Sequence, residues 1–343
     1  MMLTQARSID SQTSPVRNHS TLDQLLQSIQ PAPQGIPQSL WKSALAGPIT
    51  EFLTRPGKQF RHRFVELAWQ LGGQADSPPP ILGWVVELLH AGSLIVDDIQ
   101  DDSLQRRGRP ALHRQIGLPL ALNAGNWLYF WPMKLIRESH FDPSVESRLI
   151  ACCLDTIQRC HEGQALDLAA KIGELHPSEI RPVVQTISAW KTGSLMALAG
   201  SLGAIAADAP PETFHALEQF GEHLGIALQM QNDLSELTGA AGPLKHPEDL
   251  IHGRATWPWA WAAERLPSAQ FDWLQLRAAK LTQGIGCAAT LADDLLAALG
   301  SSPARLVRDW LDSAWANLTE TLPDSPAMQA LHAEIKRLET RYV

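Results

Sequence analysis

The sequence predicts an all-α protein, and three observations lead to this prediction. Long segments carry apolar residues at three- and four-residue intervals, which is the period of an amphipathic helix. Strand signals are almost absent, because the chain has no Asn-Gly or Asp-Gly hairpin and no sustained alternation of β-branched residues. The 343 residues are 45% hydrophobic, which is ample for one large core.

The expected elements follow one another along the chain with Pro or Gly near their ends. We expect a flexible N-terminal tail over residues 1–37, which are polar and rich in Ser and Gln, and a single domain over residues 38–343. Small residues recur from Gly193 to Ala207, which indicates a tightly packed interior helix. This run has about 15 residues, fewer than the ~20 that span a bilayer, so no membrane span is predicted. Further helical patterns cover Pro79 to Gln100, His215 to Leu237 and Ser302 to Leu322.

Charge and terminal composition exclude other classes of protein. The formal net charge of -8 argues against a nucleic-acid-binding protein, whose binding surface normally produces a basic excess. The N-terminal segment lacks the apolar region of a signal peptide, so we expect a cytoplasmic protein.

An acidic cluster follows the apolar run Leu94 to Val96, where a helix should be entering the core. It consists of Asp97, Asp98, Asp101 and Asp102. On a helix, carboxylates four residues apart share a face and repel each other by a few tenths of a kcal/mol. The cluster is either a solvated helix end or a site for a hard cation such as Mg²⁺, which prefers oxygen ligands and shares its coordination shell with phosphates.

Two basic clusters accompany these carboxylates. Each is either an ordinary surface turn or, beside a metal, a source of the charge-assisted hydrogen bonds that a diphosphate accepts. The second cluster lacks the spacing of a P-loop, so it gives little support for nucleotide binding. The first cluster holds Arg106, Arg107 and Arg109, and the second, PGKQFRHR, holds Gly57, Lys58, Arg61 and Arg63.

A fourth cluster, LQMQNDLSEL, places polar side chains inside an otherwise apolar helix. Such groups need partners, which either an internal polar network or a second oxygen-rich metal site would supply. Its polar residues include Gln229, Asn232, Asp233 and Glu236, and the nearby polar and cationic residues are Lys191, Thr192, Lys245 and Arg254.

In order and spacing, these motifs resemble those of the trans-isoprenyl diphosphate synthases, also called polyprenyl synthetases. The segments are PGKQFR, ELLHAGSLIVDDIQDDSLQRRGRPALH, GQALDL, WKTGSL, LQMQND and EDLIHGRATWP, and they extend roughly from Pro56 to Pro258. The chain is most similar to geranylgeranyl diphosphate synthases. The resemblance implies the isoprenoid synthase fold, in which antiparallel helices surround a central cavity, and a homodimer.

The resemblance also implies a role for each matching residue. The residues implied in metal binding are Asp97, Asp101, Asn232, Asp233 and Glu236, with Asp98 in support. They would hold three Mg²⁺ ions per active site once diphosphate is bound. The residues implied in binding the allylic diphosphate are Arg106, Lys191, Thr192, Gln229, Lys245 and Arg254. Those implied in binding isopentenyl diphosphate are Gly57, Lys58, Arg61, His90 and Arg107. The residues implied in catalysis are Asp97, Asp98, Asp101, Arg106, Lys191 and Lys245.

The implied reaction is a Mg²⁺-dependent prenyl transfer by ionisation, condensation and elimination. Positive charges stabilise the departing pyrophosphate, and isopentenyl diphosphate attacks the allylic cation. The second motif departs from the family, because NDLSE stands in place of DDxxD and Asn232 lacks the charge of an aspartate. Two alternatives therefore stay open: a class I terpene cyclase of synthase ancestry acting on farnesyl or geranylgeranyl diphosphate, and a non-catalytic partner subunit. The complete isopentenyl diphosphate set favours elongation.

Product length depends on residues below the first aspartate. Gly92 and Ser93, about one turn earlier, are small and leave that level of the cavity open. Trp127 and Phe130, in the segment NWLYFW, are expected to form a deeper floor. We therefore expect a C20 product, geranylgeranyl diphosphate.

Overall fold

The computed structural model describes residues 21–57, 59–239 and 248–339, and it confirms the all-α prediction. The α-helices are α1 (Leu22–Gln27), α2 (Gln38–Trp41), α3 (Gly47–Leu53), α4 (Phe60–Leu71), α5 (Ile81–Gln100), α6 (Leu112–Ile116), α7 (Leu118–Glu138), α8 (Pro143–Ala169), α9 (Pro177–Ile187), α10 (Ser194–Ala206), α11 (Pro211–Thr238), α12 (Glu248–Ile251), α13 (Trp257–Arg265), α14 (Ser268–Leu281), α15 (Ala288–Leu299), α16 (Ser302–Thr321) and α17 (Pro326–Glu339). Two π-helical segments, η1 (Lys42–Ala46) and η2 (Ser188–Gly193), and two short strands, β1 (Gln105–Arg106) and β2 (Arg109–Pro110), complete the described elements.

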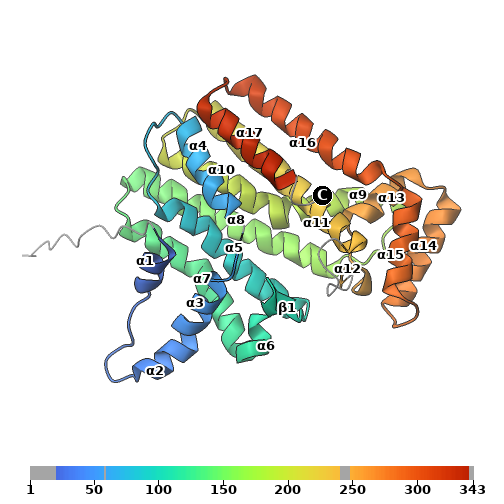
Figure 1. Ribbon diagram of the computed structural model, residues 1–343, viewed down its shortest axis with the longest axis horizontal. Helices are drawn as coiled ribbons and strands as arrows, with labels where there is room; N and C mark the ends of the chain where they lie inside the picture. The colour runs from blue at the N-terminus through green and yellow to red at the C-terminus, as the bar shows by residue number, and fades with distance from the viewer. Residues whose placement is uncertain (1–20, 58, 240–247, 340–343) are drawn as a thin grey trace, which may run out of the picture.

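The long helices α5, α7, α8, α10 and α11 form the centre of the molecule (Figure 1). Helix α5 packs along α7, and α10 packs against α4, α8 and α11. Helices α16 and α17 cover α11 and α4 respectively, while α12 to α15 gather at the end of the molecule away from α1 to α3 (Figure 1). The centre of this bundle is therefore enclosed by helices on several sides.

Helix α10 is the predicted interior helix of small residues. Every residue from Ser194 to Ile205 is buried, which confirms the prediction. A Cβ atom added at Gly200 would lie 2.7 Å from the carbonyl oxygen of Leu217, so only glycine permits the close approach of α11 there. Among the described residues, no helix has the length and apolar character needed to cross a bilayer.

A β-hairpin follows α5, and the sequence signals did not predict it. Strands β1 and β2 are antiparallel, with Arg106 paired to Arg109. The two connecting residues, Arg107 and Gly108, both have positive φ, at 54° and 74°. Positive φ at both central residues is the geometry of a two-residue type I′ turn, which normally carries Asn-Gly or Asp-Gly. The arginine in the first position hid this signal.

The predicted N-terminal tail lies partly outside the described residues. Its described part contains α1, which begins with a capping box between Thr21 and Gln24. Leu25 of α1 is fully buried in the core, and Trp41 Nε1 donates a hydrogen bond of 3.0 Å to the carbonyl oxygen of Gln30. Residues 21–30 therefore pack onto the helical domain, and the proposed boundary at residue 38 divides this packed region.

Candidate active site

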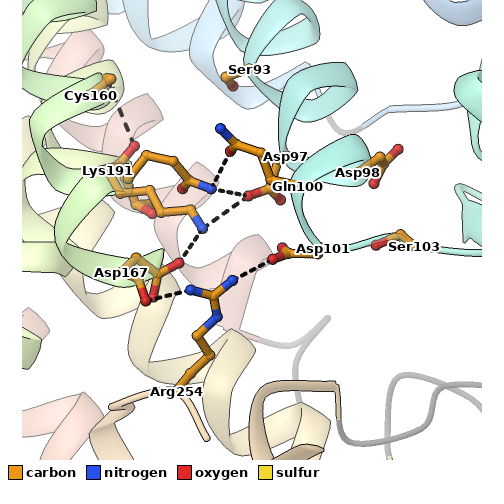
Figure 2. Close-up of polar contacts among 12 residues, drawn as sticks. Ser93, Asp97, Asp98, Gln100, Asp101, Ser103, Cys160, Asp167, Lys191 and Arg254 are labelled. Carbon is orange, nitrogen blue, oxygen red and sulfur yellow. Dashed lines mark hydrogen bonds and ion pairs between the residues drawn. The ribbon is translucent and has the colours of Figure 1, made fainter. Parts of the chain in front are cut away.

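The first acidic motif lies at the end of α5, where Asp97 points toward π-helix η2 (Figure 2). Asp97 Oδ1 lies 3.0 Å from Lys191 Nζ and accepts a hydrogen bond of 3.1 Å from Gln164 Nε2. Lys191 Nζ also lies 2.8 Å from Asp167 Oδ2. One lysine therefore bridges the carboxylates of α5 and α8.

Asp101 faces a second cation, Arg254, in the segment after α12. Arg254 Nη2 lies 2.6 Å from Asp101 Oδ1, and its Nη1 donates a 2.5 Å hydrogen bond to the carbonyl oxygen of Asp167 (Figure 2). Arg254 is only 4% exposed. Because a helix places Asp97 and Asp101 on one face, Lys191 and Arg254 line up along the same side of α5.

Asp98 points to the other side of α5 and holds Arg106 of the hairpin. Arg106 Nε donates a hydrogen bond of 2.7 Å to Asp98 Oδ1. Asp98 is fully buried, and its Oδ2 has no hydrogen-bond partner. Burial raises the pKa of Asp98 to about 6 even though Arg106 acts to lower it. Asp98 therefore positions an arginine instead of facing Lys191 and Arg254.

The pKa values of Asp97 and Asp101 shift in opposite directions. Burial acts to raise the pKa of Asp97, but the charges of Lys191 and Arg106 outweigh it and the pKa is lowered. Burial, followed by the charge of Asp97, raises the pKa of Asp101 in spite of Lys191 and Arg254. Asp97 is thus the more strongly stabilised anion of the pair.

Most of the residues predicted to hold isopentenyl diphosphate converge behind the hairpin. His90 lies two turns before Asp97 on α5, and burial together with the charges of Arg61 and Arg107 lowers its pKa well below the usual value. A Cβ atom added at Gly57 would lie 3.3 Å from Arg107 Nη1, so the PGK loop contacts the hairpin turn. The site thus combines a neutral imidazole with two cations; Lys58 lies outside the described residues.

The second motif divides between a buried network and an exposed edge. Asp233, 5% exposed, accepts hydrogen bonds of 2.7 Å from Gln229 Nε2 and 3.0 Å from the backbone N–H of Trp257. Gln229 Oε1 accepts a hydrogen bond of 2.7 Å from Thr192 Oγ1. These contacts form an internal polar network, which was one of the two interpretations of this cluster. Burial raises the pKa of Asp233 to about 7.

Asn232 and Glu236 occupy the edge of the same helix, α11. Asn232 is exposed, and Glu236 Oε1 accepts a hydrogen bond of 2.8 Å from the backbone N–H of Asp249. A small polar cavity of about 40 Å³ lies beside Asp233, and its lining also includes Asp167, Lys191 and Asp249. Lys245 lies outside the described residues.

The donor set suits a hard cation, although the side chains are not gathered around one point. Within the described ranges, no group of three or more His, Cys, Asp or Glu residues is arranged to hold a metal ion. The candidate ligands Asp97, Asp101, Asn232 and Glu236 offer oxygen atoms alone, which is the chemistry that Mg²⁺ prefers. Lys191 and Arg254 form ion pairs with Asp97 and Asp101 instead. The set therefore fits a metal that binds together with an anion, because the anion can form ion pairs with the two cations and free the carboxylates.

The residues expected to control product length separate in the structure. Gly92 lies at the crossing of α5 and α7, where an added Cβ would come 2.9 Å from the carbonyl oxygen of Gly125. Ser93 Oγ donates a hydrogen bond of 2.8 Å to the carbonyl oxygen of His90. Trp127 is partly buried, with its ring 4.7 Å from that of Trp131. Phe130 is 71% exposed and points away from the core in the single chain.

Sequence reasoning missed two side chains of this site. Gln164 and Asp167 both belong to GQALDL, which contributed to the resemblance but supplied no site residue. Both contact the Asp97–Lys191 pair directly. Their three-residue spacing, which places them on one face of a helix, was the signal that could have identified them.

The comparisons with known proteins establish the family of the chain. The model of the polyprenyl synthetase family matches residues 42–299, so the chain belongs to this family. A geranylgeranyl pyrophosphate synthase from Penicillium janthinellum is 30% identical over 216 residues, which are 62% of this chain and 56% of that protein. The chain thus matches just over half the length of that relative.

Solved structures confirm the predicted isoprenoid synthase fold. A geranylgeranyl pyrophosphate synthetase from Pyrococcus horikoshii has a TM-score of 0.72 and 24% identity, covering 88% of this chain and 91% of its own. A geranylgeranyl pyrophosphate synthase from Corynebacterium glutamicum, complexed with isoprenyl diphosphate and magnesium, has a TM-score of 0.71 and 20% identity, covering 89% and 90%. At these identities the likeness is one of fold.

Proposed function

We propose that the protein is a Mg²⁺-dependent prenyltransferase that joins an allylic diphosphate to isopentenyl diphosphate. One observation carries this proposal: two separate groups of cationic or imidazole side chains converge on α5. Lys191 and Arg254 face Asp97 and Asp101, while Arg61 and Arg107 lie beside His90. Two diphosphate substrates need two such groups, and the names of the relatives agree with this activity.

In the proposed mechanism, the allylic diphosphate binds between Lys191, Arg254 and Arg106. Asp98 holds Arg106 in place, so its guanidinium charge is fixed before the substrate arrives. Mg²⁺, held by Asp97, Asp101 and the exposed edge of the second motif, would supply Lewis-acid charge to the diphosphate. The fixed cations stabilise the pyrophosphate as the carbon–oxygen bond breaks, and the allylic cation is then attacked by the double bond of isopentenyl diphosphate.

The proton lost in the last step needs an acceptor. His90 is neutral, but it belongs to the isopentenyl diphosphate group together with Arg61 and Arg107. The released pyrophosphate lies next to the condensing carbon atoms and is itself a base. We therefore assign the proton to pyrophosphate, and no separate general base among the side chains is required.

For a C20 product we propose Tyr129 as the side chain that limits the cavity at the level of Gly92 on α5. The ring of Tyr129 contacts the Gly92 position, and it meets His161 edge to face at 5.1 Å. Burial raises the pKa of Tyr129, with the nearby thiol of Cys160 and carboxylate of Asp97 adding to the shift, so the hydroxyl stays protonated. Tyr129, partly buried on α7, is therefore a better candidate for the floor of the cavity than the exposed Phe130, whereas its neighbour His161 on α8 is exposed.

The cyclase alternative depends on aromatic side chains around the cation. Trp257, Trp259 and Trp261 are all 1% exposed or less and belong to the apolar core. They pack against Trp310 and Phe271 and do not form an open aromatic surface. Burial of these rings favours elongation over cyclisation.

A homodimer remains part of the proposal. Helix α7 exposes Leu118, Leu122 and Phe130, which are 52%, 37% and 71% exposed. Spacings of four and eight residues place them on one face of the helix, and a second copy of the chain would cover this face. A cytoplasmic location stays a prediction from the sequence.

The proposal is tested by incubating the protein with Mg²⁺ and dimethylallyl, geranyl or farnesyl diphosphate, with and without isopentenyl diphosphate. Longer diphosphates that form only when isopentenyl diphosphate is present are the expected result. A hydrocarbon or alcohol formed from farnesyl or geranylgeranyl diphosphate alone would show a cyclase instead. Inactivity in both formats with excess Mg²⁺ would leave the partner-subunit interpretation.

A further inference from the structure

Arg55 is a buried arginine that belongs to neither acidic motif. It follows α3 and directly precedes the PGK loop, and it is 3% exposed. Its Nη1 donates a hydrogen bond of 3.2 Å to the carbonyl oxygen of Arg106, and its Nη2 donates one of 3.0 Å to the carbonyl oxygen of Pro110. One guanidinium thus binds the backbone of both strands of the hairpin.

Glu51, one turn earlier on α3, holds this guanidinium in place. Its Oε2 accepts a hydrogen bond of 2.8 Å from Arg55 Nη2, and its Oε1 accepts one of 3.2 Å from Arg109 Nη1. Burial acts to raise the pKa of Glu51, but the hydrogen bonds and charges of Arg55 and Arg109 outweigh it and lower the pKa. The carboxylate therefore stays ionised, and it links α3 to the hairpin through the side chain of Arg109.

The hairpin carries one arginine for each diphosphate. Arg106 reaches Asp98 on α5, on the side proposed for the allylic diphosphate. Arg107, at the turn with φ of 54°, contacts the position of Gly57 in the loop proposed for isopentenyl diphosphate. Arg55 lies two residues before Gly57 in the chain, so its guanidinium connects that loop directly to the hairpin.

Only an arginine can make this set of contacts. Its planar fork presents several N–H donors in fixed directions, whereas a lysine presents one compact charge on a flexible stem. A carbonyl oxygen that loses its buried donor keeps the full cost of desolvation. Replacing Arg55 by lysine should therefore release one strand of the hairpin while preserving the charge.

We propose that Arg55, held by Glu51, is a positioning residue that sets the relative placement of the two diphosphate sites. The inference rests on the proposed function for the identity of the two ligands. The role of Arg55 in holding the hairpin is independent of that function, because its contacts with the hairpin are present without a substrate.

The test compares the full-length protein with the variants Arg55→Lys and Glu51→Gln, and with Arg277→Lys as a matched control. Arg277, a partly buried arginine of α14, likewise pairs with a carboxylate, Asp294 of α15. Four measurements are made on each protein: KM and kcat for both substrates, binding of inorganic pyrophosphate with Mg²⁺ by calorimetry, hydrogen exchange of the backbone amides of residues 105–109, and the thermal unfolding temperature.

We expect Arg55→Lys to raise the KM for both substrates about tenfold, as the loss of one charge-assisted hydrogen bond would, with a smaller change in kcat. Hydrogen exchange should accelerate in residues 105–109 and not elsewhere, and Glu51→Gln should show the same pattern more weakly. A purely structural role would lower the unfolding temperature without this local pattern. Arg277→Lys should leave both KM values and the exchange of the hairpin unchanged.

The proposal is overturned if Arg55→Lys keeps wild-type KM values and hairpin exchange, or if Arg277→Lys produces the same changes. Failure of the proposed function gives a different result, because the wild-type chain would then not elongate any allylic diphosphate. In that case, faster hairpin exchange and weaker pyrophosphate binding in Arg55→Lys alone would still support the positioning role. Unchanged exchange and binding would refute it.

Discussion

Restoring the missing aspartate of the second motif, by Asn232→Asp, tests the metal site directly. Asn232 is exposed on α11, whereas the neighbouring Asp233 is buried with both oxygens already hydrogen-bonded. The substitution therefore adds one carboxylate at the edge of the motif and leaves the internal network in place. Glu236, one turn later, is the nearest acidic neighbour on the same face.

The expected effect is small without Mg²⁺ and large with it. In the absence of metal, repulsion between the new carboxylate and Glu236 costs a few tenths of a kcal/mol, as for like charges four residues apart. When metal is present, a neutral amide ligand is replaced by a charged one. Losing only an outer partner of a metal ligand costs about 10–100-fold in affinity, so we expect half-saturation at a Mg²⁺ concentration lower by about tenfold or more.

The assay is a Mg²⁺ titration of chain elongation, together with a thermal-unfolding titration of Mg²⁺ in the presence of pyrophosphate. Gln231→Glu serves as the matched control, because it adds the same charge to the adjacent position on a different face of α11. An unchanged Mg²⁺ requirement in Asn232→Asp would refute the assignment of this position to the metal. An equal effect of Gln231→Glu would show that the gain is nonspecific.

Four further predictions concern other parts of the structure. Lys191→Met should lower the free energy of unfolding in urea by about 1–3 kcal/mol, since it removes the ammonium that pairs with the half-buried carboxylates of Asp97 and Asp167, and Lys191→Arg should lose less. Ser93→Phe should shorten the product, which mass spectrometry of the prenyl chains would show; an unchanged length would place the cavity elsewhere. Phe130→Glu should give a monomer by light scattering, and a dimer of wild-type mass would show that this face of α7 is not the interface. Cys287 should be alkylated by iodoacetamide before the other cysteines, because it is exposed and a backbone hydrogen bond from Thr290 helps to lower its pKa, whereas burial raises the pKa of the others.

The helices and the first acidic motif could be predicted from the sequence because both depend on local spacing. A four-residue interval places Asp97 and Asp101 on one face in any helix, whatever the rest of the fold. The burial of α10 was likewise evident from its small residues. Spacing could not show that Asp98 faces the hairpin and remains buried beside Arg106.

The second motif shows where local spacing stops being informative. Asn232, Asp233 and Glu236 have the spacing of metal ligands, and the same spacing is compatible with an internal network. Only the tertiary structure brings Gln229 and the backbone of Trp257 to Asp233. The metal assignment of Asn232 and Glu236 stays a prediction.

Arg55 had no signal in the sequence at all. Its acceptors in the hairpin are carbonyl groups 51 and 55 positions away, and a carbonyl group carries no residue identity. Phe130 is 71% exposed on α7, and the segment NWLYFW alone does not show which of its rings face the interior of the bundle. Both cases depend on tertiary structure and not on local spacing.

The pairing of Asp97 with Lys191 and of Asp101 with Arg254 has a consequence for the order of events. In the ligand-free protein these carboxylates already have partners, so a free divalent ion must compete with the half-buried ammonium of Lys191 and the buried guanidinium of Arg254. Pyrophosphate alone must likewise draw the cations away from their carboxylates. When the metal ion and pyrophosphate bind together, the carboxylates exchange their cationic side chains for the metal, and the cationic side chains exchange the carboxylates for pyrophosphate. Each charged group of the protein then keeps a partner of opposite charge. The protein is therefore expected to respond to the coincidence of metal and diphosphate, and to respond weakly to either one alone.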